Sequence, residues 1–301
     1  PPRPRPGDAD GVRRGRRAPT IRVVLETGSR ARPTRVEVAP GAPAPTRTLV
    51  PHEHGAYGQL VMPLVTALAV ARPTAAALAL GAALVVAFVA HESLLVVLGQ
   101  RGKRALEGDG PRARRVLAIL GTAALALGAA GLALAPPRAR IALALPIALG
   151  AAVAGLVLRR QEKTIAGETL VAAALSSGGL VVALAGGASL RVALACWIAW
   201  VLAFAAATLA VQVILVRARS KGRRDPGLSH AAATVVLVAG AFAAASGAAL
   251  PWTAAIAVLP TAALSLAVCL ARFSPKRLRE LGWAMIGSSA LTMLILIAGL
   301  R

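Results

Sequence analysis

The sequence predicts an all-α fold, a polytopic bundle of about nine transmembrane helices. Hydrophobic residues make up 57% of the 301 residues, charged residues 15%, and the mean hydropathy is +0.69. A soluble domain needs more polar surface than this. Beyond residue 50 the chain is a series of apolar runs of about 20 residues, long enough to cross a bilayer as helices. The runs do not alternate apolar and polar residues, so a membrane β-barrel is not expected.

The apolar runs define the nine predicted spans. They are residues 56–71, 75–98, 116–135, 141–158, 165–186, 192–216, 229–249, 252–271 and 281–300. Arg72-Pro73 separates the first two, since proline after a charged residue ends one helix and starts another.

The charges beside these spans orient the bundle. The links after spans 2, 4, 6 and 8 hold 18 Lys and Arg, and the other side holds 5. Positive residues favour the cytoplasmic side, so we expect the N-terminus inside and the C-terminus outside. All twelve acidic residues and all four histidines fall in the N-terminal tail or on the inner side. We therefore expect a multi-pass protein of the bacterial cytoplasmic (inner) membrane.

Residues 1–50 are expected to form a disordered basic tail, ahead of a transmembrane domain at 51–301. The tail has 11 Arg, no Lys and many Pro and Gly, and it cannot bury enough apolar surface to fold. The chain begins with Pro1 and its first methionine is Met62, which favours an over-extended gene start with the true start near residues 40–50. The alternative is a tail that touches anionic lipid. The net charge of +22 suggests nucleic acid, but the cations lie in the tail or beside apolar runs, so no nucleic-acid partner is expected.

Polar residues near the inner ends of three spans are the candidate catalytic residues. His91 and Glu92 lie roughly 10 Å from the inner boundary of span 2. Gln212 lies at a similar depth in span 6, and Gln59 lies near the start of span 1. Ionisable residues at such depth usually face a cavity or a partner, so we expect a polar, inward-opening cavity among spans 1, 2 and 6. The alternative is a packing pair near the interface. For Glu168, which opens span 5, the helix dipole accounts for the carboxylate.

A motif of His52, Glu53, His54 and Gly55 precedes span 1. On an extended stretch the two histidines share one side and, with Glu53 and His91, would be able to hold a metal ion. No metal-binding spacing such as HExxH is present, so no metal site is predicted.

Basic residues beside spans 2 and 6 are the candidate anion-binding groups. They are Arg101, Lys103, Arg104, Arg217, Lys221 and Arg223. A dense basic rim of this kind suits a diphosphate or a lipid phosphate. The two links resemble each other, which hints at an internal repeat.

The stretch Pro51-His52-Glu53-His54-Gly55-Ala56-Tyr57, followed by Pro63, resembles the opening of the YwiC-like membrane protein family. That family begins its first helix with P-x-x-H-G-A-aromatic and has a proline several residues on. It has no established activity, so the resemblance implies a membrane protein without implying a reaction.

The nine-helix, N-inside topology also resembles UbiA-type intramembrane prenyltransferases. Those enzymes hold Mg²⁺ with Asp-rich motifs at the cytoplasmic ends of helices 2 and 6. Here the positions where further acids would stand hold Leu95, Gly99, Val216 and Ser220. The resemblance therefore implies a UbiA-like fold without the ordinary prenyltransferase mechanism.

Three functions remain open from the sequence. The best supported is binding or modification of a lipid or anionic isoprenoid at the inward site. The alternative is a small-molecule or proton-coupled transporter, although the outer half has no ionisable residues to form a path. The third is a non-enzymatic membrane assembly partner. The sequence leaves open the cofactor and whether the protein is an enzyme.

Overall fold

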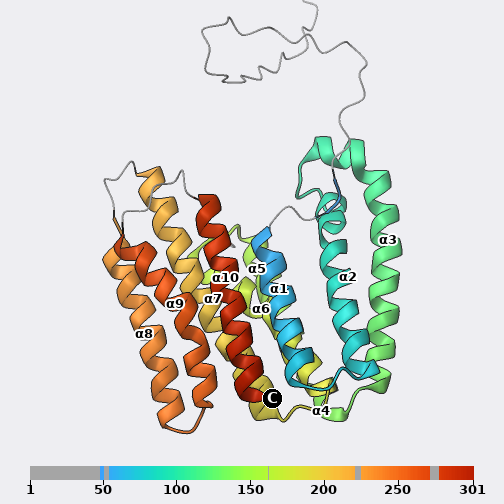
Figure 1. Cartoon of the computed structure of the whole chain (residues 1–301). Helices are drawn as coiled ribbons and strands as arrows, with labels where there is room; N and C mark the ends of the chain where they lie inside the picture. The colour runs from blue at the N-terminus through green and yellow to red at the C-terminus, as the bar shows by residue number, and fades with distance from the viewer. Residues whose placement is uncertain (1–47, 51–53, 162, 221–224, 272–277) are drawn as a thin grey trace, which may run out of the picture. The chain divides into compact units, whose positions relative to one another are not determined.

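The computed structural model describes residues 48–50, 54–161, 163–220, 225–271 and 278–301, which lie in one unit, Thr46–Arg301. In these ranges all regular secondary structure is helical (Figure 1). The helices are α1 (His54–Val70), α2 (Ala75–Val97), α3 (Lys103–Leu134), α4 (Pro137–Ala142), α5 (Ala144–Leu158), α6 (Ile165–Ala185), α7 (Leu190–Arg219), α8 (Gly227–Ser246), α9 (Trp252–Leu270) and α10 (Leu278–Leu300).

The prediction of an all-α bundle with about nine apolar spans is confirmed. In the described ranges, eight helical segments are long and apolar enough to cross a membrane, with α4 and α5 counted together as Pro137–Leu158. The ninth is α1, whose apolar part, Gly55–Val70, is shorter. The protein is therefore a multi-pass protein of a lipid bilayer.

The helix α3 is longer than the span predicted for it. The apolar run begins at residue 116, whereas the helix begins at Lys103. Residues 103–115 include Ala, Leu, Glu, Lys and Arg, which favour helix, so the charged link continues the helix past the apolar run. About thirteen residues of α3, roughly 20 Å, extend beyond the hydrophobic part.

Consecutive spans alternate in direction, so their links gather at two ends of the bundle (Figure 1). At one end, the Arg72 backbone N–H donates to the Gly186 carbonyl at 3.0 Å, and Arg191 Nη2 donates to the Ala248 carbonyl at 3.2 Å. These bonds join the links that precede α2, α7 and α9. We call this the opposite end. The ends of the helices at the α2–α3, α5–α6, α7–α8 and α9–α10 links form the basic end, so called because those of the predicted inner cations that the structure describes lie there.

Hydroxyl side chains cap three of the helices. Thr74, Thr164 and Ser189 precede α2, α6 and α7, and each accepts a hydrogen bond from the backbone N–H three residues on, at 3.2, 3.0 and 3.3 Å. Such caps satisfy N–H groups that the helix itself leaves without a partner. They set where α2, α6 and α7 begin.

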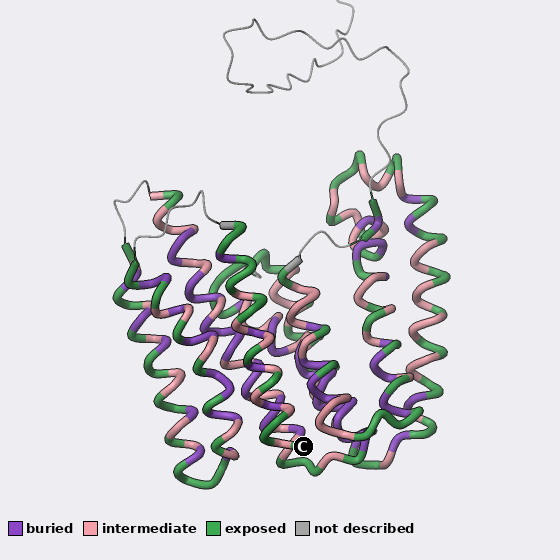
Figure 2. The backbone as a smooth tube through the Cα atoms, viewed as in Figure 1, coloured by how far each residue is buried: buried purple, intermediate pink, exposed green. Residues whose placement is uncertain are grey.

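Two glycines let α6 pack closely against α1 and α2. A Cβ on Gly178 would lie 2.6 Å from Leu84 Cδ1 of α2, and one on Gly179 would lie 2.9 Å from the Pro63 carbonyl oxygen of α1. Small residues allow this approach, and in a bilayer helix association depends on it, since lipid tails are as apolar as the side chains. Buried segments accordingly concentrate on α6 and α7 (Figure 2).

Hydrogen bonds between helices add to this packing. Trp200 Nε1 of α7 donates to Thr66 Oγ1 of α1 at 3.1 Å, and Thr66 in turn donates to the Met62 carbonyl at 2.8 Å. Trp200 is 1% exposed and Thr66 is fully buried. The bond fixes α1 against α7 where water does not compete for either partner.

We expect Gly179→Ala to lower the thermal stability of the detergent-purified protein, because the added methyl group must displace the Pro63 carbonyl. Overpacking of this kind typically costs about 1–3 kcal/mol. Gly121→Ala in α3 is the matched control, since nothing lies within 4 Å of its Cβ position. Thermal unfolding followed by size-exclusion chromatography would measure both variants. Equal unfolding midpoints for Gly179→Ala and Gly121→Ala would show that the close contact at Gly179 does not contribute to stability.

Candidate functional site

The residues that the sequence predicts to form a site lie on helices that pack against one another along the bundle. The helices α1 and α6 each pack against both α2 and α7, and α1 also packs against α6. Near the start of α1, Tyr57 meets Phe88 of α2 edge to face, with ring centroids 5.0 Å apart. The predicted spans 1, 2 and 6 correspond to α1, α2 and α7, so α6 is the additional wall.

The α2–α6 contact sets the relative depth of the polar residues. His91 lies seven residues beyond Leu84 towards the basic end, or about 10 Å, and Glu168 lies ten residues from Gly178 in the same direction, or about 15 Å. His91 and Glu168 therefore lie within about one helical turn of the same depth.

Glu92 is held inside the α2–α3 hairpin. Its carboxylate is 1% exposed and accepts two bonds from Arg101, Nε to Oε1 at 3.0 Å and Nη2 to Oε2 at 2.5 Å. This bidentate geometry is the strongest form of an arginine–carboxylate pair. His91, one position earlier, is exposed. The two neighbours thus point in different directions, as residues about 100° apart on a helix do.

Gln212 pairs with a residue that the sequence assigned to helix stability. Its Nε2 donates to Glu168 Oε2 at 3.0 Å, joining α7 to the first turn of α6. Both side chains are half-buried. Glu92 and Gln212, predicted to line one cavity, have different partners. Sequence reasoning missed Glu168 because a carboxylate in a first helical turn needs no other explanation.

Arg217, predicted to bind an anion, forms hydrogen bonds to groups of the protein itself. Its guanidinium donates to Asp225 Oδ1 at 2.8 Å and to the carbonyls of Val268, Cys269 and Ala271 at 3.1, 2.7 and 2.8 Å. These carbonyls end α9, so Arg217 satisfies acceptors that the helix leaves free. The side chain is 12% exposed.

The remaining predicted cations divide into two groups. Lys103 and Arg104 stand exposed in the first turn of α3, and Arg101 is 31% exposed beside them while it pairs with Glu92. Lys221 and Arg223 lie outside the described residues.

The opening motif is only partly described. His52 and Glu53 lie outside the described residues, and His54 begins α1. Gly55 is exposed, and Gln59 is half-buried one turn further along. Among the residues that the structure does describe, no three His, Cys, Asp or Glu side chains gather as metal ligands would.

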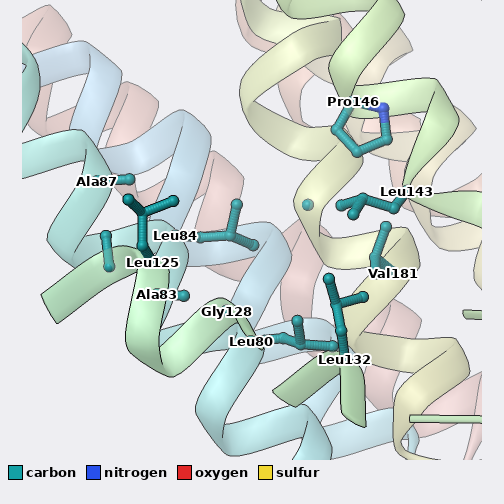
Figure 3. Close-up of a pocket in the computed structure, with 12 residues that line it drawn as sticks. Leu80, Ala83, Leu84, Ala87, Leu125, Gly128, Leu132, Leu143, Pro146 and Val181 are labelled. Carbon is teal, nitrogen blue, oxygen red and sulfur yellow. The ribbon is translucent and has the colours of Figure 1, made fainter. Parts of the chain in front are cut away.

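A pocket lies away from this polar region. It has a volume of about 220 Å³ and is lined by Leu, Ala, Gly, Pro and Val side chains of α2, α3, α5 and α6, together with Leu143 from the α4–α5 junction. In Figure 3, Leu84 of α2 and Leu125 of α3 lie across it from Leu143 and Pro146. The pocket has no polar side chain, so it offers contact to an apolar chain and no chemistry.

The helices of this region also carry the likeness to known proteins. Residues 50–183 match the family of YwiC-like proteins. The match confirms the resemblance indicated by residues 51–57, and it extends from α1 into α6. Gln212 and the helices from α7 onward lie beyond the YwiC-like region. Comparison with curated proteins and with solved structures found no match to the chain. The UbiA-like fold therefore stays a prediction.

We expect Arg101→Gln to lower the unfolding temperature by several degrees, because it leaves the buried Glu92 charge without its bidentate partner. The double variant Glu92→Gln/Arg101→Gln should recover part of the loss, since it removes both charges. Arg104→Gln, which removes an exposed cation three residues away, is the control. A double variant less stable than Arg101→Gln would contradict this account of the pair.

Proposed function

We propose that the protein resides in the bacterial cytoplasmic membrane and binds, at its basic end, the phosphate headgroup of an anionic lipid or isoprenoid. The observation that carries this proposal is the charged extension of α3, residues 103–115. Five of its side chains are exposed cations beyond the apolar part of the helix: Lys103, Arg104, Arg112, Arg114 and Arg115. Cations in this position meet lipid phosphates, each worth about 1 kcal/mol of attraction.

The distribution of ionisable residues supports the same end. In the described spans, His91, Glu92, Glu168 and His230 all lie towards the basic end. We propose His91, exposed on α2, as the group that contacts the headgroup, while Glu92 fixes the hairpin that presents Lys103 and Arg104. A bound phosphate would thus meet cations first and the imidazole behind them.

Continuous helices favour lipid binding over transport. Transporters commonly bind their substrates at discontinuous helices near the bilayer midplane. Here α1 and α9 run unbroken through Pro63 and Pro260, and the α4–α5 junction at Leu143 lies near the opposite end. The described helices therefore supply no unwound segment at mid-depth.

We expect Lys103→Gln/Arg104→Gln to weaken retention of phosphatidylglycerol roughly thirtyfold, because two headgroup contacts worth about 1 kcal/mol each are lost. Native mass spectrometry of protein purified in mild detergent with added lipid would count the bound molecules. Arg72→Gln/Arg301→Gln removes the same charge at the opposite end and should leave retention unchanged. Equal retention by both double variants would refute the assignment of the site to α3.

The orientation can be tested with single cysteines, since the native Cys196 and Cys269 are buried. Lys163→Cys places a thiol at the basic end and Ser246→Cys places one at the opposite end, and both positions are exposed. On intact cells a membrane-impermeant maleimide should label Ser246→Cys alone, and on inverted vesicles Lys163→Cys alone. The reverse pattern would overturn the cytoplasmic placement of the basic end.

A further inference from the structure

Glu168 differs in its partner from Glu92 and Asp225, the two other carboxylates at the basic end that are described above. Glu92 and Asp225 form ion pairs with Arg101 and Arg217, whereas the partner of Glu168 is the neutral amide of Gln212. In the described parts of the chain no Lys or Arg nitrogen pairs with Glu168, although the protein carries a net charge of +22. Among the described residues, this half-buried anion therefore has no cationic partner.

The Glu168–Gln212 pair presents acceptors rather than donors. Gln212 Nε2 donates to Glu168 Oε2. The remaining acceptor atoms of the pair are Oε1 of Glu168 and Oε1 of Gln212. A partly desolvated carboxylate is stabilised most by a positive group that also donates hydrogen bonds. A primary ammonium, with three N–H donors and one positive charge, meets both requirements.

Three cationic residues precede Glu168 in the chain. Arg159, Arg160 and Lys163, all exposed, occupy the turn that links α5 to α6, and Glu168 follows in the first turn of α6. Positive and negative groups therefore lie within nine residues of each other in the chain, at the basic end. A ligand that satisfies both has a phosphate linked by a short spacer to an amine.

We propose that Glu168 and Gln212 bind the primary ammonium group of a phosphate-linked amine, with its phosphate on Arg159, Arg160 and Lys163. The same chemistry occurs in the headgroup of phosphatidylethanolamine and in free phosphoethanolamine. This inference rests on the proposed function only in placing a phosphate at the basic end. It adds that the ligand carries an amine, and that Glu168 selects for it.

The test is retention of lipid by the full chain in nanodiscs containing equal amounts of phosphatidylethanolamine, phosphatidylcholine and phosphatidylglycerol, read by native mass spectrometry. We expect the wild type to retain phosphatidylethanolamine over phosphatidylcholine, whose trimethylammonium group has no N–H donor. Glu168→Gln should reduce that preference about tenfold, the usual worth of a charge-assisted hydrogen bond. Glu107→Gln, an exposed carboxylate on α3 at the same end, should preserve it.

A second variant and a competition experiment complete the test. Glu168→Asp, which retains the charge, should keep part of the preference and serves if Glu168→Gln does not fold. Displacement of bound phosphatidylethanolamine by added phosphoethanolamine would identify the soluble compound as a ligand. If added phosphoethanolamine displaces no lipid, the ligand is the lipid. A wild type that retains both lipids equally, or an unchanged preference in Glu168→Gln, overturns the inference. A persistent amine preference, with phosphatidylglycerol binding indifferent to Lys103→Gln/Arg104→Gln, would sustain the inference while refuting the proposed function.

Discussion

The close approach of α6 to α1 and α2 is the contact on which the rest of the bundle depends. An added Cβ at Gly178 would meet the end of the Leu84 side chain at 2.6 Å, and one at Gly179 would meet the Pro63 carbonyl oxygen at 2.9 Å. Since lipid surrounds the helices, contacts of this kind take the place of the hydrophobic effect that drives packing in water. The helix α6 also packs against α4, α5 and α7, so its position sets the depth of every polar residue at the basic end.

Charged residues at the basic end have two roles: the buried ones stabilise the structure, and the exposed ones can contact a ligand. Glu92 and Arg217 are largely withdrawn from solvent, and their bonds to Arg101 and to the end of α9 fix local structure. Lys103 and Arg104 stand exposed on α3 and are available to a ligand. The internal pairs hold the hairpins in place, and the exposed cations depend on that framework for their position. Glu168, held by a neutral amide, adds a negative charge among them.

The YwiC-like region ends inside the bundle rather than at its edge. Residues 50–183 contain His91 and Glu168 but not Gln212, which reaches Glu168 from α7. The proposed amine site is therefore built across the limit of the match. The buried bond from Trp200 to Thr66 crosses the same limit, so α7 completes both the packing and the site.

The sequence by itself determined the helical class, the spans and their alternation, because the length of an apolar run and the placing of charge are local properties of the chain. It also located the polar residues at one end. It did not reveal that Glu92 turns to Arg101, that Arg217 caps α9, or that Gln212 meets Glu168. Those outcomes depend on which helices lie side by side and how they are rotated. Hydropathy is nearly the same around such apolar helices, and only the fit of small and large side chains in three dimensions decided their rotation.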